Sequence, residues 1–436
     1  MLRTVRPLRR LPLLGKTAVA RSAVREVDHE ARPLYVVWEL TLKCDLACIH
    51  CGSRAGRVRE GELGKEEALS VVDQLAAMGT REITLIGGEA YLHDAWEAVV
   101  RAIVAKGMTC GIVTGGRGID RGMAARIRDA GIDGVSVSVD GLETTHDALR
   151  GVRGSFRSAL GALEHLEAVG VRRAINSQIN RASVRELEPL LDVVSARGLY
   201  GWQLSMTVPM GRAADREHLL LQPFQMIETF AMLSRLEAKT RALGIMLFAG
   251  NNVGYFGPYE ERLRRETPRE GCGAGRTTMG IEANGDIKGC PSLPSDAYVG
   301  GNVRTDRLED IWLGSDALKF TRARTTAELT GYCATCYYAE DCLAGCSWTS
   351  HVFFGRRGDN PYCHHRALER LAEGKRERVV MREKAEGVPF DHGLFEIVIE
   401  DYPGDDLARA RAIAESGEGF VEEGLVLPSP RPAIRG

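Results

Sequence analysis

The sequence predicts an α/β protein: a partial (β/α)6 barrel of the TIM type, followed by a loop-rich C-terminal domain that holds most of the cysteines. From Tyr35 to about Thr207, short apolar runs alternate with amphipathic stretches of helical period. Such alternation indicates βαβ units and a parallel sheet. After Pro209 this rhythm changes, and seven of the eleven cysteines then fall between Cys272 and Cys363. Because barrels of this kind bind ligands at the C-terminal ends of their strands, we expect the site there.

Six apolar runs are the expected barrel strands, and the amphipathic stretches between them are the expected helices. The predicted strands are Tyr35–Leu42, Glu82–Ile86, Thr109–Thr114, Gly134–Val139, Arg173–Ile179 and Trp202–Thr207. The predicted helices are Lys65–Met78, Ala95–Lys106, Met123–Ala130, Phe156–Val169 and Val184–Arg197. Right-handed crossovers between parallel strands would curl six such units into a partial barrel.

The rest of the chain is less regular. Pro223–Leu243 has the pattern of one long helix, and Gly250–Pro258 is rich in turn residues and is expected to be a loop. A charged helix is expected from 367 to about 384, then a strand at Leu394–Glu400, a helix and a disordered tail. The predicted domains are a basic N-terminal extension (1–33), the barrel (34–243), a linker (244–271), the cysteine-rich domain (272–366) and a C-terminal helix, strand and tail (367–436).

Composition and charge exclude several classes of protein. Apolar residues make up 44% of the 436 residues and charged residues 27%, which excludes a largely disordered chain. The formal net charge of −2 gives no global reason to bind nucleic acid or an anionic membrane. No apolar run approaches the 18 residues of a membrane-spanning helix. The first 25 residues are basic without an acid, typical of a transit peptide, a peptide-contacting arm or, as we favour, a simple basic extension.

The cysteines are grouped rather than scattered. An odd count of eleven fits poorly with a closed disulfide framework, and no signal-peptide pattern precedes the cysteines. We therefore expect a cytoplasmic location, where closely spaced cysteines are more often metal ligands than disulfide partners.

The first group lies at the end of the first predicted strand. Cys44, Cys48 and Cys51 fall within eight residues. Three thiolates can hold three corners of an iron–sulfur cubane and leave one iron open. A structural zinc ion would need a fourth ligand, and His50 is a poor choice because adjacent residues rarely reach one tetrahedral ion. The spacing favours a cluster with an open iron.

A second motif, Gly87-Gly88-Glu89, ends the second predicted strand. Two glycines let a ligand approach the backbone closely, and a carboxylate follows them. By itself this motif could be an ordinary turn from strand to loop. Because it ends the strand next to the one that carries the cysteines, both motifs should face the same opening.

Together these residues resemble the radical S-adenosylmethionine (SAM) superfamily. The three-cysteine loop, with a ring residue at His50, is similar to the family's cluster loop. The segment Gly87–Glu89 resembles the one that binds the amino group of SAM, although Ala90 stands where the family usually has proline. The resemblance implies a [4Fe–4S] cluster that SAM chelates through its amino and carboxylate groups.

The resemblance also implies further SAM contacts. Thr114, followed by two glycines, lies where the family often has Thr-Asn-Gly, and Ser138 corresponds to the serine that bonds the SAM carboxylate or ribose. Asn176 lies with Gln178 on a strand that can flank the adenosine.

Arg150 resembles an arginine that pairs with the SAM carboxylate, a task that suits the planar fork of a guanidinium. The alternative for Arg150 is a surface ion pair with Asp147.

The C-terminal cysteines resemble the SPASM domain, an auxiliary-cluster extension of radical SAM enzymes that modify peptides. They are Cys272, Cys290, Cys333, Cys336, Cys342, Cys346 and Cys363. By the family's pattern, the four at 333, 336, 342 and 363 hold auxiliary cluster II. Those at 272, 290 and 346 hold auxiliary cluster I, which is then one cysteine short. The alternative for these seven cysteines is a pair of zinc ribbons. The eleventh cysteine, Cys110, belongs to neither motif and is expected to be a core residue.

The function that the resemblance implies is radical chemistry on a peptide. An electron from a partner such as flavodoxin or ferredoxin cleaves SAM to a 5′-deoxyadenosyl radical, which takes hydrogen from the substrate, most often a ribosomally made precursor peptide. Pro291 stands where sulfatase-maturing members carry an aspartate that serves as the catalytic base, which counts against sulfatase maturation. The 33 residues before the barrel are too few for the family's peptide-recognition domain, so a separate leader-recognition protein or the C-terminal region is expected to take that role.

Two alternatives remain open at this point. The chain could be a radical SAM enzyme that modifies a small molecule or tetrapyrrole precursor, or an iron–sulfur electron carrier or zinc scaffold. No catalytic residue is identified. The candidate pocket residues, each of which has a structural role as its alternative, are Tyr91, His93, Asn251, Tyr255 and Arg212.

Overall fold

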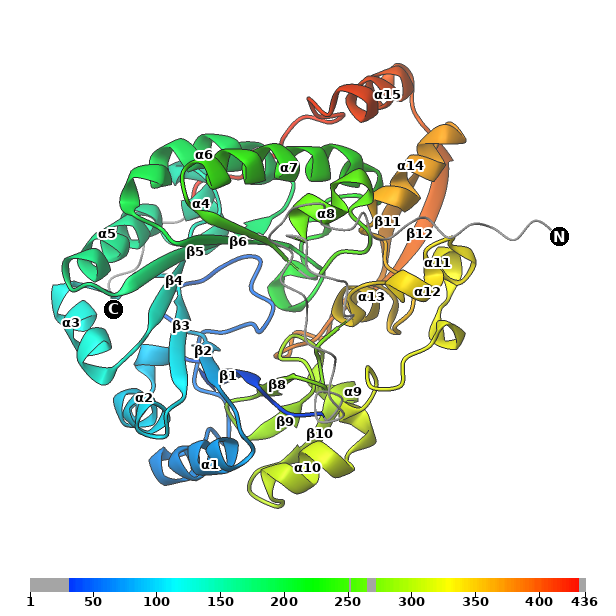
Figure 1. The fold of residues 1–436 in the computed structure, drawn as a ribbon. Coiled ribbons are helices and arrows are strands. Elements are labelled where there is room, and N and C mark those ends of the chain that lie inside the picture. The colour runs from blue at the N-terminus through cyan, green and yellow to red at the C-terminus, as the bar shows by residue number, and fades with distance from the viewer. Residues whose placement is uncertain (1–30, 251, 265–271, 431–436) are drawn as a thin grey trace, which may run out of the picture.

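The computed structural model describes residues 31–250, 252–264 and 272–430, and its main feature is one curved sheet (Figure 1). The strands of the barrel are β1 (Tyr35–Thr41), β2 (Glu82–Gly87), β3 (Thr109–Thr114), β4 (Gly134–Ser138), β5 (Arg172–Ile179), β6 (Gly201–Met206) and β7 (Met246–Ala249). They pair in parallel in that order. The six predicted strands are confirmed, and β7, a short half-exposed run that the sequence pattern missed, adds to the edge.

Helices cover the outer face of this sheet (Figure 1). They are α1 (Lys65–Ala77), α2 (Trp96–Ala105), α3 (Arg121–Ala130), α4 (Glu143–Arg150), α5 (Ser155–Ala168), α6 (Leu187–Val194) and α7 (Met226–Ala242). Local chemistry sets their ends: the Asp120 side chain accepts from the Met123 amide at 2.8 Å to start α3, and Gly131 at φ +100° ends it. Alternate strand residues such as Val36, Trp38 and Leu40 face these helices and form the core.

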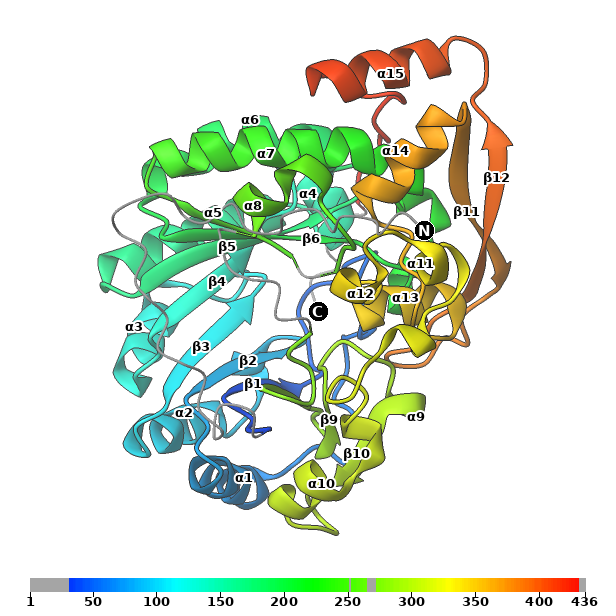
Figure 2. The same cartoon turned by 45° about the vertical axis from the view of Figure 1, so that its right-hand side comes forward.

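The cysteine-rich segment is joined to the barrel by the same sheet. Strand β8 (Thr278–Ile281) pairs in parallel with β1, and β9 (Asp286–Lys288) and β10 (Val299–Asn302) follow antiparallel. The short helix α8 (Glu260–Leu263) precedes the segment, and its own short helices are α9 (Ser295–Tyr298), α10 (Leu308–Gly314), α11 (Gly331–Thr335), α12 (Ala339–Cys342) and α13 (Ser347–Phe354). Figure 2 shows this segment lying across the open side of the barrel.

A buried group of charges links the two regions. Glu282, beside β8, binds Arg59 at 2.6 Å and Lys288 of β9 at 2.5 Å, and Arg59 also lies 3.5 Å from Glu39 of β1. The Lys288 ammonium is fully buried and lies 4.3 Å from the centre of the Phe390 ring. Two acids and two bases therefore neutralise one another where the barrel, the β8–β9 hairpin and the C-terminal region meet.

The C-terminal region differs from the prediction. The expected helix from 367 to 384 is wrong: α14 (His364–Ala372) stops before Gly374, and the charged run becomes β11 (Lys375–Glu383). It pairs antiparallel with β12 (Leu394–Asp401). The charged residues that suggested a helix form ion pairs between the two strands instead, such as Arg378–Glu400.

The final helix, α15 (Asp406–Ser416), is confirmed. The residues after it, predicted to be disordered, are described up to 430 and contact the barrel. Val421 is buried, and its amide donates to the Glu228 carboxylate of α7 at 2.5 Å. Burial raises the pKa of Glu228 to about 7, from 4.5 for a free glutamate.

We expect Glu228→Gln to flatten the dependence of stability on pH. Because its folded-state pKa is raised, Glu228 contributes stability that is fully present below pH 4.5 and lost as the pH rises through 7. The loss is at most about 3 kcal/mol. Thermal midpoints at pH 5 and pH 8 should differ less in the variant than in the wild type. Glu415→Gln, at an exposed residue of α15, is the control and should keep the wild-type profile; equal profiles for all three proteins would contradict this account.

Candidate functional site

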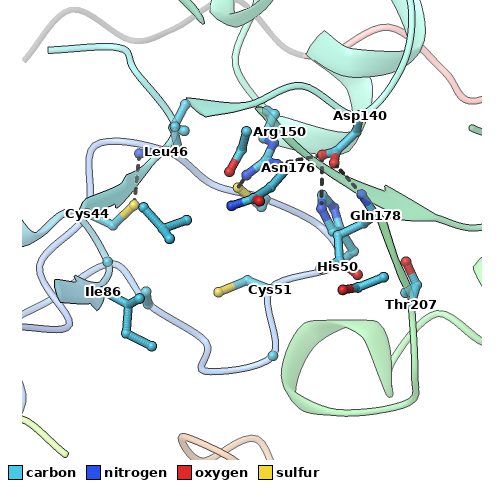
Figure 3. Close-up of a pocket in the computed structure, with 18 of the residues that line it drawn as sticks. Cys44, Leu46, His50, Cys51, Ile86, Asp140, Arg150, Asn176, Gln178 and Thr207 are labelled. Carbon is cyan, nitrogen blue, oxygen red and sulfur yellow. Dashed lines mark hydrogen bonds and ion pairs between the residues drawn. The ribbon is translucent and has the colours of Figure 1, made fainter. Parts of the chain in front are cut away.

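A cavity of about 290 Å³ lies at the C-terminal ends of strands β1 to β6. Residues of all six strand ends line it, and Trp348 of α13 closes one side. The predicted residues that line it are Cys44, Cys48, Cys51, Gly87, Gly88, Glu89, Thr114, Ser138, Arg150 and Asn176. The two sequence motifs therefore do face one opening, as expected. Figure 3 shows Cys44 and Cys51 directed into the cavity, opposite Asn176 and Gln178.

The three cysteines of the cysteine loop line the cavity together. Burial raises the pKa of Cys44 to about 12 and that of Cys48 to about 11, and the neighbouring thiols add to each shift. Apart from any metal, Cys44 and Cys48 are therefore neutral at pH 7. Three cysteines at one cavity, Cys48 buried and the other two partly buried, fit an iron–sulfur cluster. The binding of such a cluster would release the protons of its thiols.

A buried carboxylate that the sequence did not single out holds this loop. Asp140, just after β4, is fully buried; its Oδ2 lies 3.1 Å from His50 Nε2 and 2.7 Å from Arg150 Nη2. Its Oδ1 accepts from the Gln178 amide at 2.8 Å. Burial alone would raise the pKa of Asp140, but Arg150 and His50 hold it well below its usual range. The sequence feature that could have identified Asp140 is its position two residues after Ser138, at the end of a buried strand.

Arg150 is therefore not paired with Asp147, so that alternative is wrong. The Asp147 carboxylate accepts from the backbone of Gly154 and Phe156 and from the hydroxyl of Ser155. Arg150 instead joins Asp140 to the Cys48 thiol, to which its Nη1 donates at 3.7 Å. Its Nε is buried without a partner in the described part of the chain. A contact from Arg150 to the SAM carboxylate stays a prediction.

Glu89 is fixed from the next strand. Its two oxygens accept from the Thr114 hydroxyl at 2.6 Å and the Gly115 amide at 2.7 Å, and burial raises its pKa to about 7. The glycines before it are required by packing: a Cβ on Gly87 would lie 2.0 Å from the Thr41 oxygen. Their expected role in ligand approach stays a prediction, but their close fit brings β2 against the cysteine loop.

Arg212 holds the opposite side of the cysteine loop. Its Nε donates to the Cys48 carbonyl at 2.6 Å and its Nη1 to the Ala55 carbonyl at 2.9 Å. Gly211, at φ +58°, lets the chain pass so close that a Cβ there would lie 2.3 Å from the Gly52 oxygen. Among the candidate pocket residues, Arg212 thus lines the cavity and supports the loop.

The other pocket candidates lie elsewhere. The Tyr91 hydroxyl accepts from the Gly118 amide, and His93 Nε2 lies 3.1 Å from the Leu63 carbonyl oxygen, so both have structural partners. Tyr255 stacks on Tyr338 with ring centres 4.4 Å apart, beside the C-terminal cysteines. Asn251 lies outside the described residues.

The C-terminal cysteines gather into two sets. Cys272, Cys290 and Cys346 influence one another electrostatically, and burial raises the pKa of Cys290 to about 12 and that of Cys346 to about 11. The second set lines a small cavity and consists of Cys333, Cys336, Cys342 and Cys363. This is the grouping that the SPASM resemblance implied, with three thiols in one set and four in the other. Cys110 is fully buried in the barrel core, as expected.

Comparison with known proteins agrees with this geometry. Residues 38–180 match the family model of the radical SAM superfamily, and residues 272–337 match that of the SPASM iron–sulfur cluster-binding domain. The chain is 32% identical to mycofactocin maturase MftC of Mycobacterium ulcerans, over 79% of this chain and 91% of that protein. It is 26% identical to the AdoMet-dependent heme synthase of Methanosarcina barkeri, over 77% and 97%.

Among solved structures, Streptococcus suis SuiB bound to S-adenosylmethionine superposes with a TM-score of 0.61 at 17% identity, over 76% of each chain. With its cysteine loop, its Gly-Gly-Glu strand end and these relatives, the chain belongs to the radical SAM superfamily, among the members with a SPASM domain. It is an enzyme that uses SAM and iron–sulfur clusters. Within the described residues, no helix is both long and apolar enough to span a membrane.

Asp140→Asn should weaken the cysteine loop. The change leaves Arg150 and His50 in a buried site without their anion, and breaking a buried ion pair costs about 3–5 kcal/mol. We expect a lower thermal midpoint and less iron per chain after anaerobic reconstitution. Asp133→Asn, which removes an exposed ion pair with Arg172, is the control and should change neither. Unaltered iron content and midpoint in Asp140→Asn would show that the loop does not depend on this carboxylate.

Proposed function

We propose that this enzyme matures a ribosomally made peptide at the cavity of the barrel. In this proposal Cys44, Cys48 and Cys51 hold a [4Fe–4S] cluster, and SAM lies between it and the ends of β2 to β5. When bound, these cofactors supply the reducing electron and the 5′-deoxyadenosyl radical that takes hydrogen from the substrate. The chain's own residues hold the loop, orient SAM and shield the cavity from water.

The observation that carries the peptide proposal is the chemistry of the cavity wall. Gln203 of β6, next to the strands assigned to SAM, lines it, and its side-chain amide makes no hydrogen bond among the described residues. Asn176 and Gln178 of β5, the expected neighbours of the adenosine, have no side-chain hydrogen bond there either. The lining contains two guanidinium groups, and both are engaged: Arg150 by Asp140 and Cys48, Arg212 by backbone carbonyls. Neutral donors and acceptors suit the amides of a peptide backbone.

The competing substrate is a tetrapyrrole precursor, which the name of the Methanosarcina barkeri relative favours. Such a precursor carries several carboxylates, and binding them in a cavity calls for cations that are free to pair. The pairing of both guanidinium groups in the lining supports a peptide segment, and the relative of higher identity is itself named as a maturase. Family membership favours an enzyme over the electron carrier or zinc scaffold.

The auxiliary cysteines complete the proposal. Cys333, Cys336, Cys342 and Cys363 would hold a four-iron cluster with a full set of thiolates. Cys272, Cys290 and Cys346 would hold a second one with an iron that lacks a cysteine. A flavodoxin or ferredoxin would supply electrons in the cytoplasm, and a separate protein or the C-terminal region would recognise a leader peptide.

The proposed reaction predicts SAM cleavage even without substrate. Anaerobically reconstituted enzyme with dithionite should form 5′-deoxyadenosine, measured by chromatography. Cys48→Ala removes one of the three thiols in the cavity and should reduce the product to background. Cys110→Ala is the matched control, because this thiol lies in the barrel core away from the cavity, and it should retain most of the activity. Full activity of Cys48→Ala would refute the cluster assignment.

The substrate class can be tested directly. Synthetic peptides from short reading frames beside the gene, and Fe-coproporphyrin III, are each added to the reduced enzyme with SAM. We expect one of the peptides to increase 5′-deoxyadenosine formation and to change in mass, because the cavity offers neutral hydrogen-bonding groups. The tetrapyrrole should do neither. Turnover of the tetrapyrrole alone would reverse the assignment.

A further inference from the structure

Arg324 is placed beside one of the two auxiliary cysteine sets. It lies between the short 3-10 helices η9 (Asp316–Leu318) and η10 (Thr326–Glu328). Its Nη1 donates to the Ser347 hydroxyl at 3.0 Å and to the Gly345 carbonyl at 3.3 Å, the two residues that flank Cys346. The guanidinium is thereby fixed next to the set of three thiols.

The charge of Arg324 has no acidic partner in the described part of the chain. Its Nε and Nη2 are buried and make no hydrogen bond there. Glu328, the nearby acid, is bound by Arg357 at 3.3 Å. Burial lowers the pKa of Arg324, whereas Cys272, Glu328 and Cys346 act in the opposite direction. A buried cation without a partner is costly, so an anionic group belongs at this place.

Two other cations that act on the auxiliary cysteines are each paired with an acid. Lys288, which influences Cys290, is bound by Glu282 at 2.5 Å. In the set of four cysteines the corresponding cation is Arg366, which Asp359 binds at 2.6 Å and Glu377 at 2.5 Å. The cation beside the four-cysteine set is thus paired with acids, whereas Arg324, beside the three-cysteine set, has no acidic partner among the described residues.

We propose that Arg324 is the charge partner of the iron–sulfur cluster at Cys272, Cys290 and Cys346, and that it makes this cluster easier to reduce than the cluster at the other four cysteines. The inference rests on the proposed cluster placement. Reduction adds a negative charge, which an uncompensated cation favours, and N–H groups directed at cluster sulfur act in the same sense. The missing fourth thiolate makes this set less negative as well, so both features distinguish the two clusters.

The test is an anaerobic redox titration followed by electron paramagnetic resonance. The full-length chain carries Cys44→Ala, Cys48→Ala and Cys51→Ala, so that only the auxiliary signals remain. Adding Arg324→Gln should move the midpoint of one signal, the one that titrates at higher potential, to a more negative value. Arg324→Lys, which keeps the positive charge, should bring this midpoint most of the way back to the wild-type value. Arg322→Gln is the matched control, since that guanidinium binds only the carbonyls of Gly275 and Trp312 and lies over the Trp312 ring; it should leave both midpoints in place.

Each outcome decides one claim. Failure of the triple variant to bind iron would refute the cluster placement itself. Two clusters with unshifted midpoints in Arg324→Gln, or an equal shift in both, would overturn the role of Arg324 alone. If Arg324→Gln loses the iron of one cluster, Arg324→Lys decides: retained iron with a wild-type midpoint supports the charge. Loss of that iron in Arg324→Lys as well would overturn it in favour of a structural role.

Discussion

A single buried carboxylate, Asp140, fixes the geometry on which the site depends. It lies at the end of β4 and binds both His50, within the cysteine loop, and Arg150, at the end of α4. Arg150 in turn reaches the Cys48 thiol. The carboxylate therefore joins the cysteine loop to β4 and α4, which come much later in the chain. Backbone hydrogen bonds from Ala47 and Ile49 to the last residues of α4 support the same contact, so the carboxylate and these amides together hold the loop against α4.

The cysteine loop is supported from two further sides. Gly87 and Gly88 lie so close to the chain that leads into the loop that a Cβ at either position would clash with its backbone. Gly211 lies equally close to the backbone at the end of the loop. Arg212 binds two of its carbonyls. The site is thus built as a loop enclosed by glycine backbones and fastened by charged groups. This arrangement leaves the amide side chains of β5 and β6 directed at the cavity without hydrogen-bond partners among the described residues.

Most of the barrel could be predicted from the sequence, because alternating apolar runs and amphipathic stretches are local signals. The cysteines and Gly87–Glu89 were recognisable for the same reason: their spacing is local. What could not be predicted depends on contacts between distant segments. The run 375–383 carries the charges of a surface helix, and only its pairing with β12 makes it a strand. The role of Asp140 depends on where α4 and the cysteine loop meet, and the docking of Val421 depends on a buried glutamate of α7.

The pairing of β8 with β1 also determines how the molecule can move and how it can be divided. The strand that leads into the first cysteine loop has β2 on one side and β8 on the other. Removing the C-terminal domain would leave the open edge of β1 exposed to pairing with other chains. The ladder also keeps the spacing between the two cysteine-bearing regions constant, since they cannot swing apart without breaking backbone hydrogen bonds. The distance between the two groups of cysteines is therefore set by the sheet itself.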